Sequence, residues 1–132
     1  MAERFTNLRS GAGGRAVHDV GGLPGGPIDR AEHDPSHYER RVDALVMLLA
    51  GHGAFRVDAL RRMVESYAEQ EYDSTGYYDR WVVAVRNLLV EQELLSRDEI
   101  EARVAAVRAR LQAEGLEVDP EPLPWPEAPV AP

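Results

Sequence analysis

The chain has 132 residues, a formal net charge of -8 at pH 7 and no cysteine. This length allows one domain with a modest core, and the absence of cysteine excludes disulfides, thiolate metal sites and a cysteine nucleophile within the chain. The acidic balance argues against nucleic acid or an anionic membrane as the main partner, because phosphate binding requires clustered Lys and Arg. With no apolar run of about 18 residues and no signal-peptide core, we expect a soluble, cytoplasmic protein.

The first zone of the chain, residues 1–33, is predicted to be an extended arm. It contains seven of the 11 glycines and shows no helical periodicity. A segment of this composition becomes ordered only by lying on another surface.

The next zone, residues 34–114, carries every strong helix signal and opens with a predicted helix from Asp34. Asp34 is placed as the N-cap with Pro35 at the first helical position, and Gly51 and Gly53 end the helix. Its apolar residues recur at spacings of three and four: Tyr38, Val42, Leu45, Val46 and Leu49.

A second helix is predicted from Val57 to Gln70, with Asp58 in its first turn, and residues 71–76 are predicted to form a polar turn. The face expected to be buried consists of Leu60, Met63, Val64 and Tyr67.

The third predicted helix, Tyr77–Leu94, has apolar residues on two sides. One stripe is formed by Tyr78, Trp81, Val82, Val85 and Leu89. The other is formed by Val83, Val90 and Leu94. Two stripes mean burial either by another chain or by neighbouring helices on both sides, and the periodicity leaves both alternatives open.

The fourth predicted helix begins after Ser96, which forms an S-x-x-E capping box with Glu99, and ends at Gly115. Its apolar repeat is Ile100, Val104, Val107 and Leu111. The last zone, residues 115–132, has six prolines and is predicted to be an extended tail. The predicted fold is therefore all-α: a small bundle of about four helices over 34–114, between two long arms.

Catalytic constellations are sparse. His33 and His37 are four residues apart, but His33 precedes the expected cap, so the pair does not form a stacked metal site. The glycines of VHDVGGLPGGPID follow no strand and open no helix, which argues against a phosphate loop. Nothing in the arrangement of Ser, His and Asp indicates a nucleophile triad. The residues alone indicate a helical subunit or interaction module without a complete active site.

Four segments carry a resemblance to a known family: VHDVGG (17–22), GPI (26–28), GAFRVDALRRMVE (53–65) and YYDRWVVAVRNLLVEQELLSRDEIE (77–101). In this order and spacing they resemble the N-terminal half of the nitrile hydratase β subunit, and also the short β subunit of thiocyanate hydrolase. A fused β subunit would continue into a small barrel domain where this chain has its proline-rich tail. The resemblance therefore implies a split β subunit.

The resemblance implies roles for several residues. Arg61 matches the family arginine that hydrogen-bonds oxidised cysteine sulfurs of the partner subunit, and the planar guanidinium suits a pair of sulfur oxyanions. Tyr77 matches a position lining the substrate pocket, with a plain interface aromatic as its other interpretation. Trp81 is expected either to lie beside that pocket or to serve as a packing residue. Helix 1 of relatives supplies a pocket tyrosine where Val42 stands, which implies a roomier cleft.

Further implied roles concern the interface with a partner. Tyr78 is expected to pack there, and His18 with Asp19 to anchor the arm across the partner chain. Relatives often have Ser or Thr as the N-cap of the second helix, whereas this chain has Arg56, so that cap must be replaced or absent.

In the family the metal is bound by an α-type subunit with a C-x-x-C-S-C motif. The resemblance favours cobalt(III) over iron(III), and this chain is expected to bind no metal. The implied activity is hydration of a nitrile to an amide, with a further barrel-domain chain completing the enzyme. The alternative in the same family is the thiocyanate hydrolase β subunit, which serves conversion of thiocyanate to carbonyl sulfide and ammonia. Outside catalysis, an activator or metallochaperone and a free helical adaptor remain alternatives.

Overall fold

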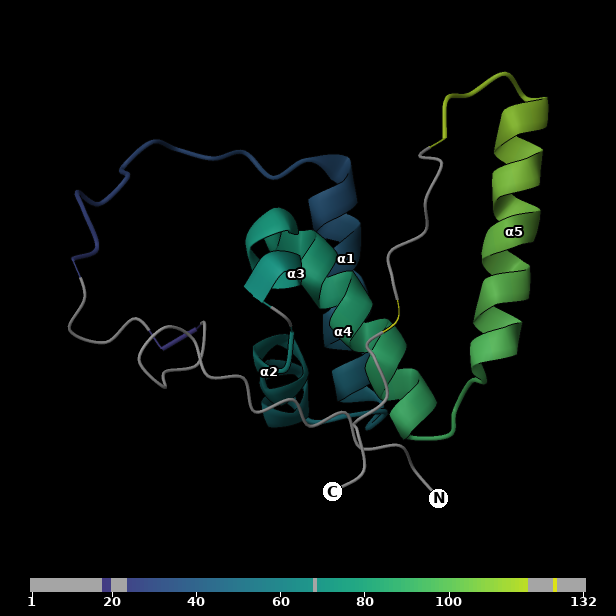
Figure 1. Cartoon of the computed structure of the whole chain (residues 1–132), viewed down its shortest axis with the longest axis horizontal. Coiled ribbons are helices and arrows are strands. Elements are labelled where there is room, and N and C mark those ends of the chain that lie inside the picture. Colours follow the sequence, from purple (N-terminus) through teal and green to yellow (C-terminus); the bar gives the residue numbers. More distant parts are fainter. Residues whose placement is uncertain (1–17, 20–23, 68, 119–124, 126–132) are drawn as a thin grey trace.

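The computed structural model describes residues 18–19, 24–67, 69–118 and 125, and within them the chain is all-α, as predicted. The helices in chain order are α1 (His37–Gly51), α2 (Val57–Glu65), α3 (Glu69–Ser74), α4 (Tyr77–Glu91) and α5 (Arg97–Ala113) (Figure 1). The described part thus has five helices where about four were predicted, because the segment 57–74 divides into two. No helix among the described residues is long and apolar enough to cross a membrane.

Helix α1 begins two residues later than predicted. Its N-cap is Ser36, whose Oγ accepts a hydrogen bond from the Glu39 N–H at 3.2 Å, while the Glu39 carboxylate accepts one from the Ser36 N–H at 2.7 Å. The prediction of Asp34 as N-cap is wrong, because this reciprocal capping box satisfies two backbone donors at once. Asp34 instead accepts a hydrogen bond from Arg40 at 2.7 Å.

Helix α2 ends at Glu65, five residues before the predicted end. Ser66 is its C-cap and donates its hydroxyl to the Met63 carbonyl at 2.7 Å. The hydroxyl of Tyr67 donates to the Arg80 carbonyl on α4 at 2.6 Å. This bond attaches the segment that follows α2 to α4. Helix α3 then covers most of the predicted turn at 71–76, so the prediction of a single helix to Gln70 followed by a turn is wrong.

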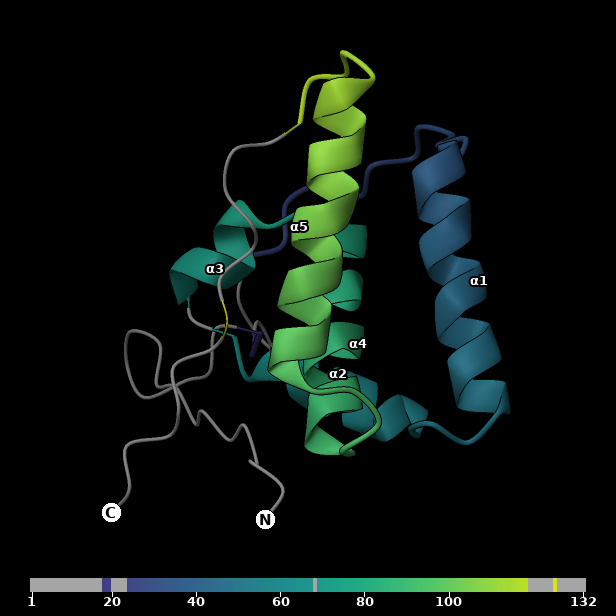
Figure 2. The same ribbon diagram turned by 90° about the vertical axis from the view of Figure 1, so that its right-hand side faces the viewer.

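Helix α4 lies at the centre of the molecule, and both α1 and α2 pack against it (Figures 1 and 2). The buried core consists of Val46, Phe55, Leu60, Met63, Tyr67, Ala84, Val85 and Leu88. Of the stripe predicted on α4, Val85 belongs to this core, but the fully buried positions are Ala84, Asn87 and Leu88. The fully buried positions of α4 are therefore rotated from the predicted stripe, although Trp81 and Leu89 of that stripe still pack against the core. Val82 and Val83 line the side that faces α5, and Val83 also packs against the core.

Helix α4 ends at Glu91 rather than at Leu94. Glu93 has a positive φ of 55°, and the N–H groups of Leu94 and Leu95 both donate to the Leu89 carbonyl. This left-handed turn satisfies the last carbonyls of α4 and stops the helix. Leu94 is consequently 54% exposed rather than part of an apolar stripe.

Helix α5 has the predicted ends but little packing. Ser96 caps it with the expected Glu99 box, and Gly115 follows it with a φ of 77°. None of its residues is buried. It stands beside α4, away from α1 and α2 (Figure 1). Residues 24–36 of the arm are exposed and lack regular structure, except that Pro35 is half-buried. The rest of the two predicted arms lies outside the described residues, apart from residues 18–19, 115–118 and 125.

Candidate functional site

Two adjacent arginines on α2 have different surroundings. Arg62 donates to the Glu91 carboxylate of α4 at 2.5 Å, and Glu91 is only 8% exposed. Arg61 is exposed, and its guanidinium has no hydrogen-bond or ion-pair partner among the described residues. One arginine thus joins two helices, whereas its neighbour is exposed on the surface of α2.

The sequence of α2 explains why Arg61 points outward. Leu60 and Met63 are buried against α4, and successive helical residues are turned by about 100°. Arg61 therefore lies away from the core, one turn before Glu65 on the same exposed side. The Nε2 atom of His18 lies 3.9 Å from the Glu65 carboxylate. The N-terminal arm thus touches the side of α2 that carries Arg61, and Asp19, next to His18, is exposed.

The first turn of α4 carries an aromatic cluster. The ring centroid of Tyr77 lies 5.2 Å from that of Tyr78 and 5.3 Å from that of Trp81, and the Tyr78 and Trp81 centroids are 5.8 Å apart. These spacings suit edge-to-face and tilted ring packing. Tyr77 is 60% exposed, so its phenol can offer a hydrogen bond while its ring is held by its neighbours.

Close to this cluster, Tyr38 of α1 is bound to α4. Its hydroxyl donates to the Asp79 carboxylate at 2.5 Å. Burial, together with this hydrogen bond and the negative charge of Asp79, raises the pKa of the Tyr38 phenol above its ordinary value. The bond therefore holds the neutral phenol and fixes the start of α4 against α1. Periodicity alone had identified Tyr38 only as an apolar-face residue, because spacing on one helix does not reveal a partner on another.

Val42 is placed differently from the other predicted pocket residues. It is only 4% exposed and is buried on α1. In this chain it offers no open surface, so its expected place beside a substrate pocket rests on the resemblance. The structure brings Tyr77, Tyr78 and Trp81 together, and Arg61 lies on α2, outside that cluster.

Buried polar groups form a feature that the sequence did not reveal. Asn87 is fully buried; its Oδ1 accepts from Arg86 Nε at 3.0 Å, and its Nδ2 has no partner within the described part of the chain. The Oε2 atom of Glu91, one turn further, also lacks a partner there. These atoms lie between the packed helices rather than in an open cleft, so they belong to the interior of the helical unit.

The described side chains contain no group of three or more His, Cys, Asp or Glu residues that could hold a metal ion. The whole chain also lacks thiolates. A metal centre built on cysteine sulfur therefore does not fit the donors of this chain, and any such ion would have to be held by another chain.

Residues 15–131 match the family described as "Nitrile hydratase beta subunit, N-terminal". The chain is 34% identical over 98 residues to the nitrile hydratase subunit beta of Rhodococcus erythropolis, covering 65% of this chain and 44% of that relative. It is 32% identical over 91 residues to the low-molecular weight cobalt-containing nitrile hydratase subunit beta of Rhodococcus rhodochrous, with 66% and 40% covered. It is 28% identical over 98 residues to the thiocyanate hydrolase subunit beta of Thiobacillus thioparus, with 74% and 62% covered.

No solved structure matches the chain. The matched region spans less than two thirds of the length of each of these relatives. The family match over residues 15–131 nevertheless includes α1 to α5 and the described residues of both arms, so Arg61 and the aromatic cluster lie inside it. The chain belongs to the family of nitrile hydratase β subunit N-terminal domains.

Proposed function

We propose that this chain is the β-type subunit of a heteromeric nitrile hydratase and completes an active-site cleft whose metal is bound by an α-type subunit. The observation that carries the proposal is the exposed guanidinium of Arg61, which has no partner among the described residues while Arg62 is paired. An unpaired, permanently charged fork on a family-matched surface suits an anionic group on another chain.

In the proposed assembly Arg61 hydrogen-bonds the oxygenated cysteine sulfurs of the α-type subunit. A bidentate donor holds two oxyanions in a fixed orientation. It thereby tunes the electronic properties of the metal ion that those sulfurs bind. The ion, cobalt(III) in preference to iron(III), would supply Lewis-acid activation when bound in the partner. The name of the Rhodococcus rhodochrous relative supports cobalt. This chain contributes the arginine and the cleft wall.

Tyr77 is the residue of this chain that we assign to the substrate. Its ring is fixed by Tyr78 and Trp81, and its exposed phenol can orient a water molecule or the nitrile by one hydrogen bond. The overall reaction adds one water molecule across the carbon–nitrogen triple bond and yields an amide. Trp81 is assigned to the apolar wall of the same cleft, whereas a place for the buried Val42 beside it rests on the resemblance alone.

We expect partner chains to bind the exposed surfaces of α1 and of the N-terminal arm. Helix α1 exposes 43% of Leu45, 66% of Met47 and 60% of Leu48. Several large apolar side chains exposed on one helix indicate a protein interface. We assign this surface, together with the arm at His18 and Asp19, to an α-type chain with a C-x-x-C-S-C motif. A small barrel-domain chain would supply the part of the relatives that this chain does not span.

The test is an Arg61→Ala chain co-expressed with the α-type and barrel-domain chains. We expect nitrile turnover to fall about 10- to 100-fold, as for other residues that orient metal ligands, with altered cysteine oxidation by mass spectrometry. Arg61→Lys should restore little, because an ammonium lacks the planar fork. Arg103→Ala is the matched control, since Arg103 is also an exposed helical arginine. Unchanged turnover, metal content and sulfur oxidation in Arg61→Ala would refute the assigned role.

A second candidate is the β subunit of a thiocyanate hydrolase. The Thiobacillus thioparus relative supports it, because that match covers 62% of the relative and 74% of this chain, more of each than the matches to the two nitrile hydratase subunits cover. Assaying the purified complex with thiocyanate and with nitriles distinguishes the two. Release of carbonyl sulfide and ammonia, without amide formation from nitriles, would select the second candidate.

A further inference from the structure

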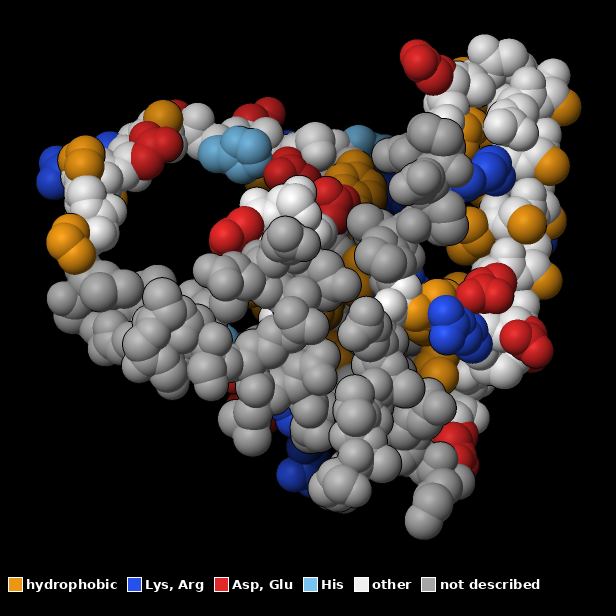
Figure 3. All heavy atoms as spheres, in the orientation of Figure 1, with side chains coloured by type: hydrophobic (Ala, Val, Ile, Leu, Met, Phe, Trp, Pro, Cys, Tyr) orange, Lys and Arg blue, Asp and Glu red, His pale blue; other side chains and the backbone are white. Residues whose placement is uncertain are grey.

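Helix α5 and the side of α4 that faces it enclose an open groove of about 650 Å³. We call it the α4–α5 groove. It is lined by Val82, Val83, Arg86, Arg97, Ile100, Glu101, Val104, Ala105, Arg108 and Trp125. Figure 3 shows hydrophobic side chains gathered between the two helices with charged ones beside them. A groove of this size and composition is within the range of ligand sites in proteins.

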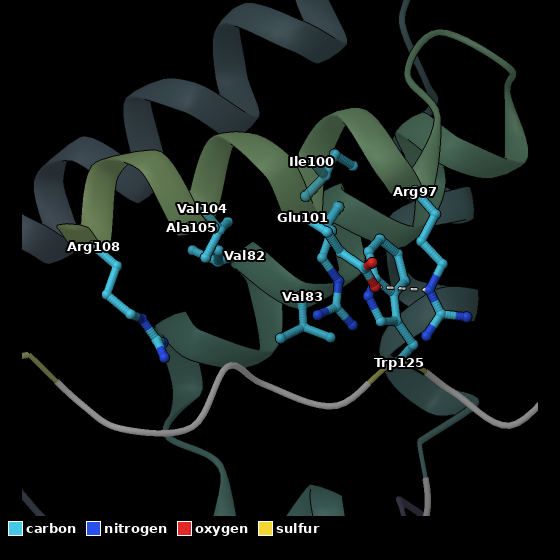
Figure 4. A pocket seen from close by; sticks show the side chains of 10 residues that line it. Val82, Val83, Arg97, Ile100, Glu101, Val104, Ala105, Arg108 and Trp125 are labelled. Atoms are coloured by element: carbon cyan, nitrogen blue, oxygen red, sulfur yellow. Dashed lines mark hydrogen bonds and ion pairs between the residues drawn. The ribbon is translucent and has the colours of Figure 1, made fainter. Parts of the chain in front are cut away.

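One side chain from far along the sequence is seated in this groove. Trp125 belongs to the C-terminal tail, and its ring lies beneath two guanidinium groups: the Arg86 Cζ is 4.0 Å and the Arg97 Cζ is 4.8 Å from the ring centroid. Figure 4 shows Trp125 beside Arg97 and Glu101, at one end of the groove. Both distances are within the range of cation–π contacts.

The two guanidinium groups are held in place by neighbouring side chains. Arg97 Nε donates to Glu101 at 3.0 Å, and Arg86 Nε donates to Asn87 at 3.0 Å. Such bonds orient the guanidinium groups against the indole ring. The arrangement therefore holds an aromatic ring between two oriented cations.

The sequence around Trp125 complements the charge of the groove. In the sequence, Pro124 and Pro126 flank the tryptophan, and Glu121 and Glu127 are within four positions of it. The lining has three arginines and a single acidic residue. We propose that the α4–α5 groove is a binding site for a tryptophan within an acidic, proline-rich segment, and that the tail of this chain is its occupant through Trp125.

This occupancy explains the position of α5. None of its residues is buried, yet Ile100 and Val104 face Val82 and Val83 across the groove. Trp125 contacts an arginine from each helix and so bridges them. The site does not depend on the proposed enzyme function, and it can be tested on the chain alone.

The test is binding of a fluorescent peptide with the sequence of residues 119–130 to the full-length Trp125→Ala chain, measured by anisotropy. A short tether gives an effective concentration of about 1 mM, so with a peptide dissociation constant of about 0.1 mM the wild-type tail excludes the peptide about tenfold. We therefore expect about tenfold tighter binding to Trp125→Ala than to wild type. Leu116→Ala, an exposed change outside the groove, should behave as wild type.

Two further comparisons identify the contacts. In the Trp125→Ala chain, Arg97→Gln should weaken peptide binding about two- to fivefold, and a peptide with alanine in place of its tryptophan should not bind. Amide exchange in α5 should be faster in Trp125→Ala than in wild type and unchanged in Leu116→Ala. Should Trp125→Ala lose helical circular dichroism, Trp125→Phe replaces it, with a smaller gain in peptide affinity.

Three results would overturn the proposal. The peptide could bind neither chain, it could bind wild type and Trp125→Ala equally, or the alanine peptide could bind as well as the tryptophan peptide. None of these results bears on Arg61 or on nitrile turnover. The groove and the enzyme function are therefore tested independently.

Discussion

Two neighbouring arginines on α2, Arg61 and Arg62, have different surroundings and therefore different roles. Arg62 reaches the nearly buried Glu91, whereas Arg61 lies about 100° further round the helix and is exposed. The sequence alone could not separate their roles, because the partner of Arg62 is 29 residues away on another helix. Only the resemblance distinguished Arg61, and the exposure of its side chain is consistent with that assignment.

The pair gives a prediction for stability. Arg62→Ala should lower the free energy of unfolding by about 2 kcal/mol, because it leaves the Glu91 carboxylate buried without its cation. We place the value below the usual 3–5 kcal/mol for a buried pair, roughly, because the Arg62 side chain is 38% exposed. Arg61→Ala should stay within about 0.5 kcal/mol. Urea unfolding of both variants measures this, and equal values for the two would contradict it.

At the scale of the helices, local capping signals predicted both ends of α5 but not the start of α1 or the end of α2. The Ser96–Glu99 box and Gly115 fixed both ends of α5, since caps are local hydrogen-bond patterns. The same S-x-x-E pattern is present at Ser36 and Glu39, whereas the prediction rested on Asp34 followed by Pro35. The correct start of α1 was therefore available in the sequence.

The division between α2 and α3 could not be predicted in the same way. It depends on Tyr67 reaching a carbonyl on α4, a tertiary contact that periodicity along one segment does not contain. The rotation of the α4 core face has a similar cause. Both sides of that helix are apolar, and the choice between them was made by where α1, α2 and α5 pack. Of the candidate site, the aromatic cluster followed from close sequence spacing, whereas the pairing of Arg62 did not.

The capping box of α5 gives a prediction in pH. Hydrogen bonds from the Ser96 backbone, and then from its hydroxyl, hold the pKa of Glu99 below its usual value. A lowered pKa in the folded state means that the stabilisation is present above the unfolded pKa and is lost as pH falls through the folded one. In Ser96→Ala we expect the Glu99 pKa to rise only partway, because the backbone donor remains. Carboxyl NMR titration measures this; an unchanged pKa would show that the hydroxyl contributes nothing.

At the scale of the whole molecule, α1 exposes three large apolar side chains, Leu45, Met47 and Leu48. Met47→Glu with Leu48→Glu should reduce self-association of the isolated chain and its binding of a hydrophobic dye. Ala102→Glu with Ala106→Glu on α5 adds the same charge at exposed positions and should leave both unchanged. Sedimentation velocity measures the association. A wild-type chain that stays monomeric and binds no dye would contradict the expectation.

The central place of α4 also governs the order of events during synthesis. Helices α1 and α2 both pack on α4, which is translated after them. At about 5–20 residues per second, α4 follows the end of α1 by a few seconds. During that interval the apolar side of α1 has no helix of its own chain to cover it. The side chains of α1 that the finished fold buries against α4 are thus exposed on the nascent chain until α4 has been made.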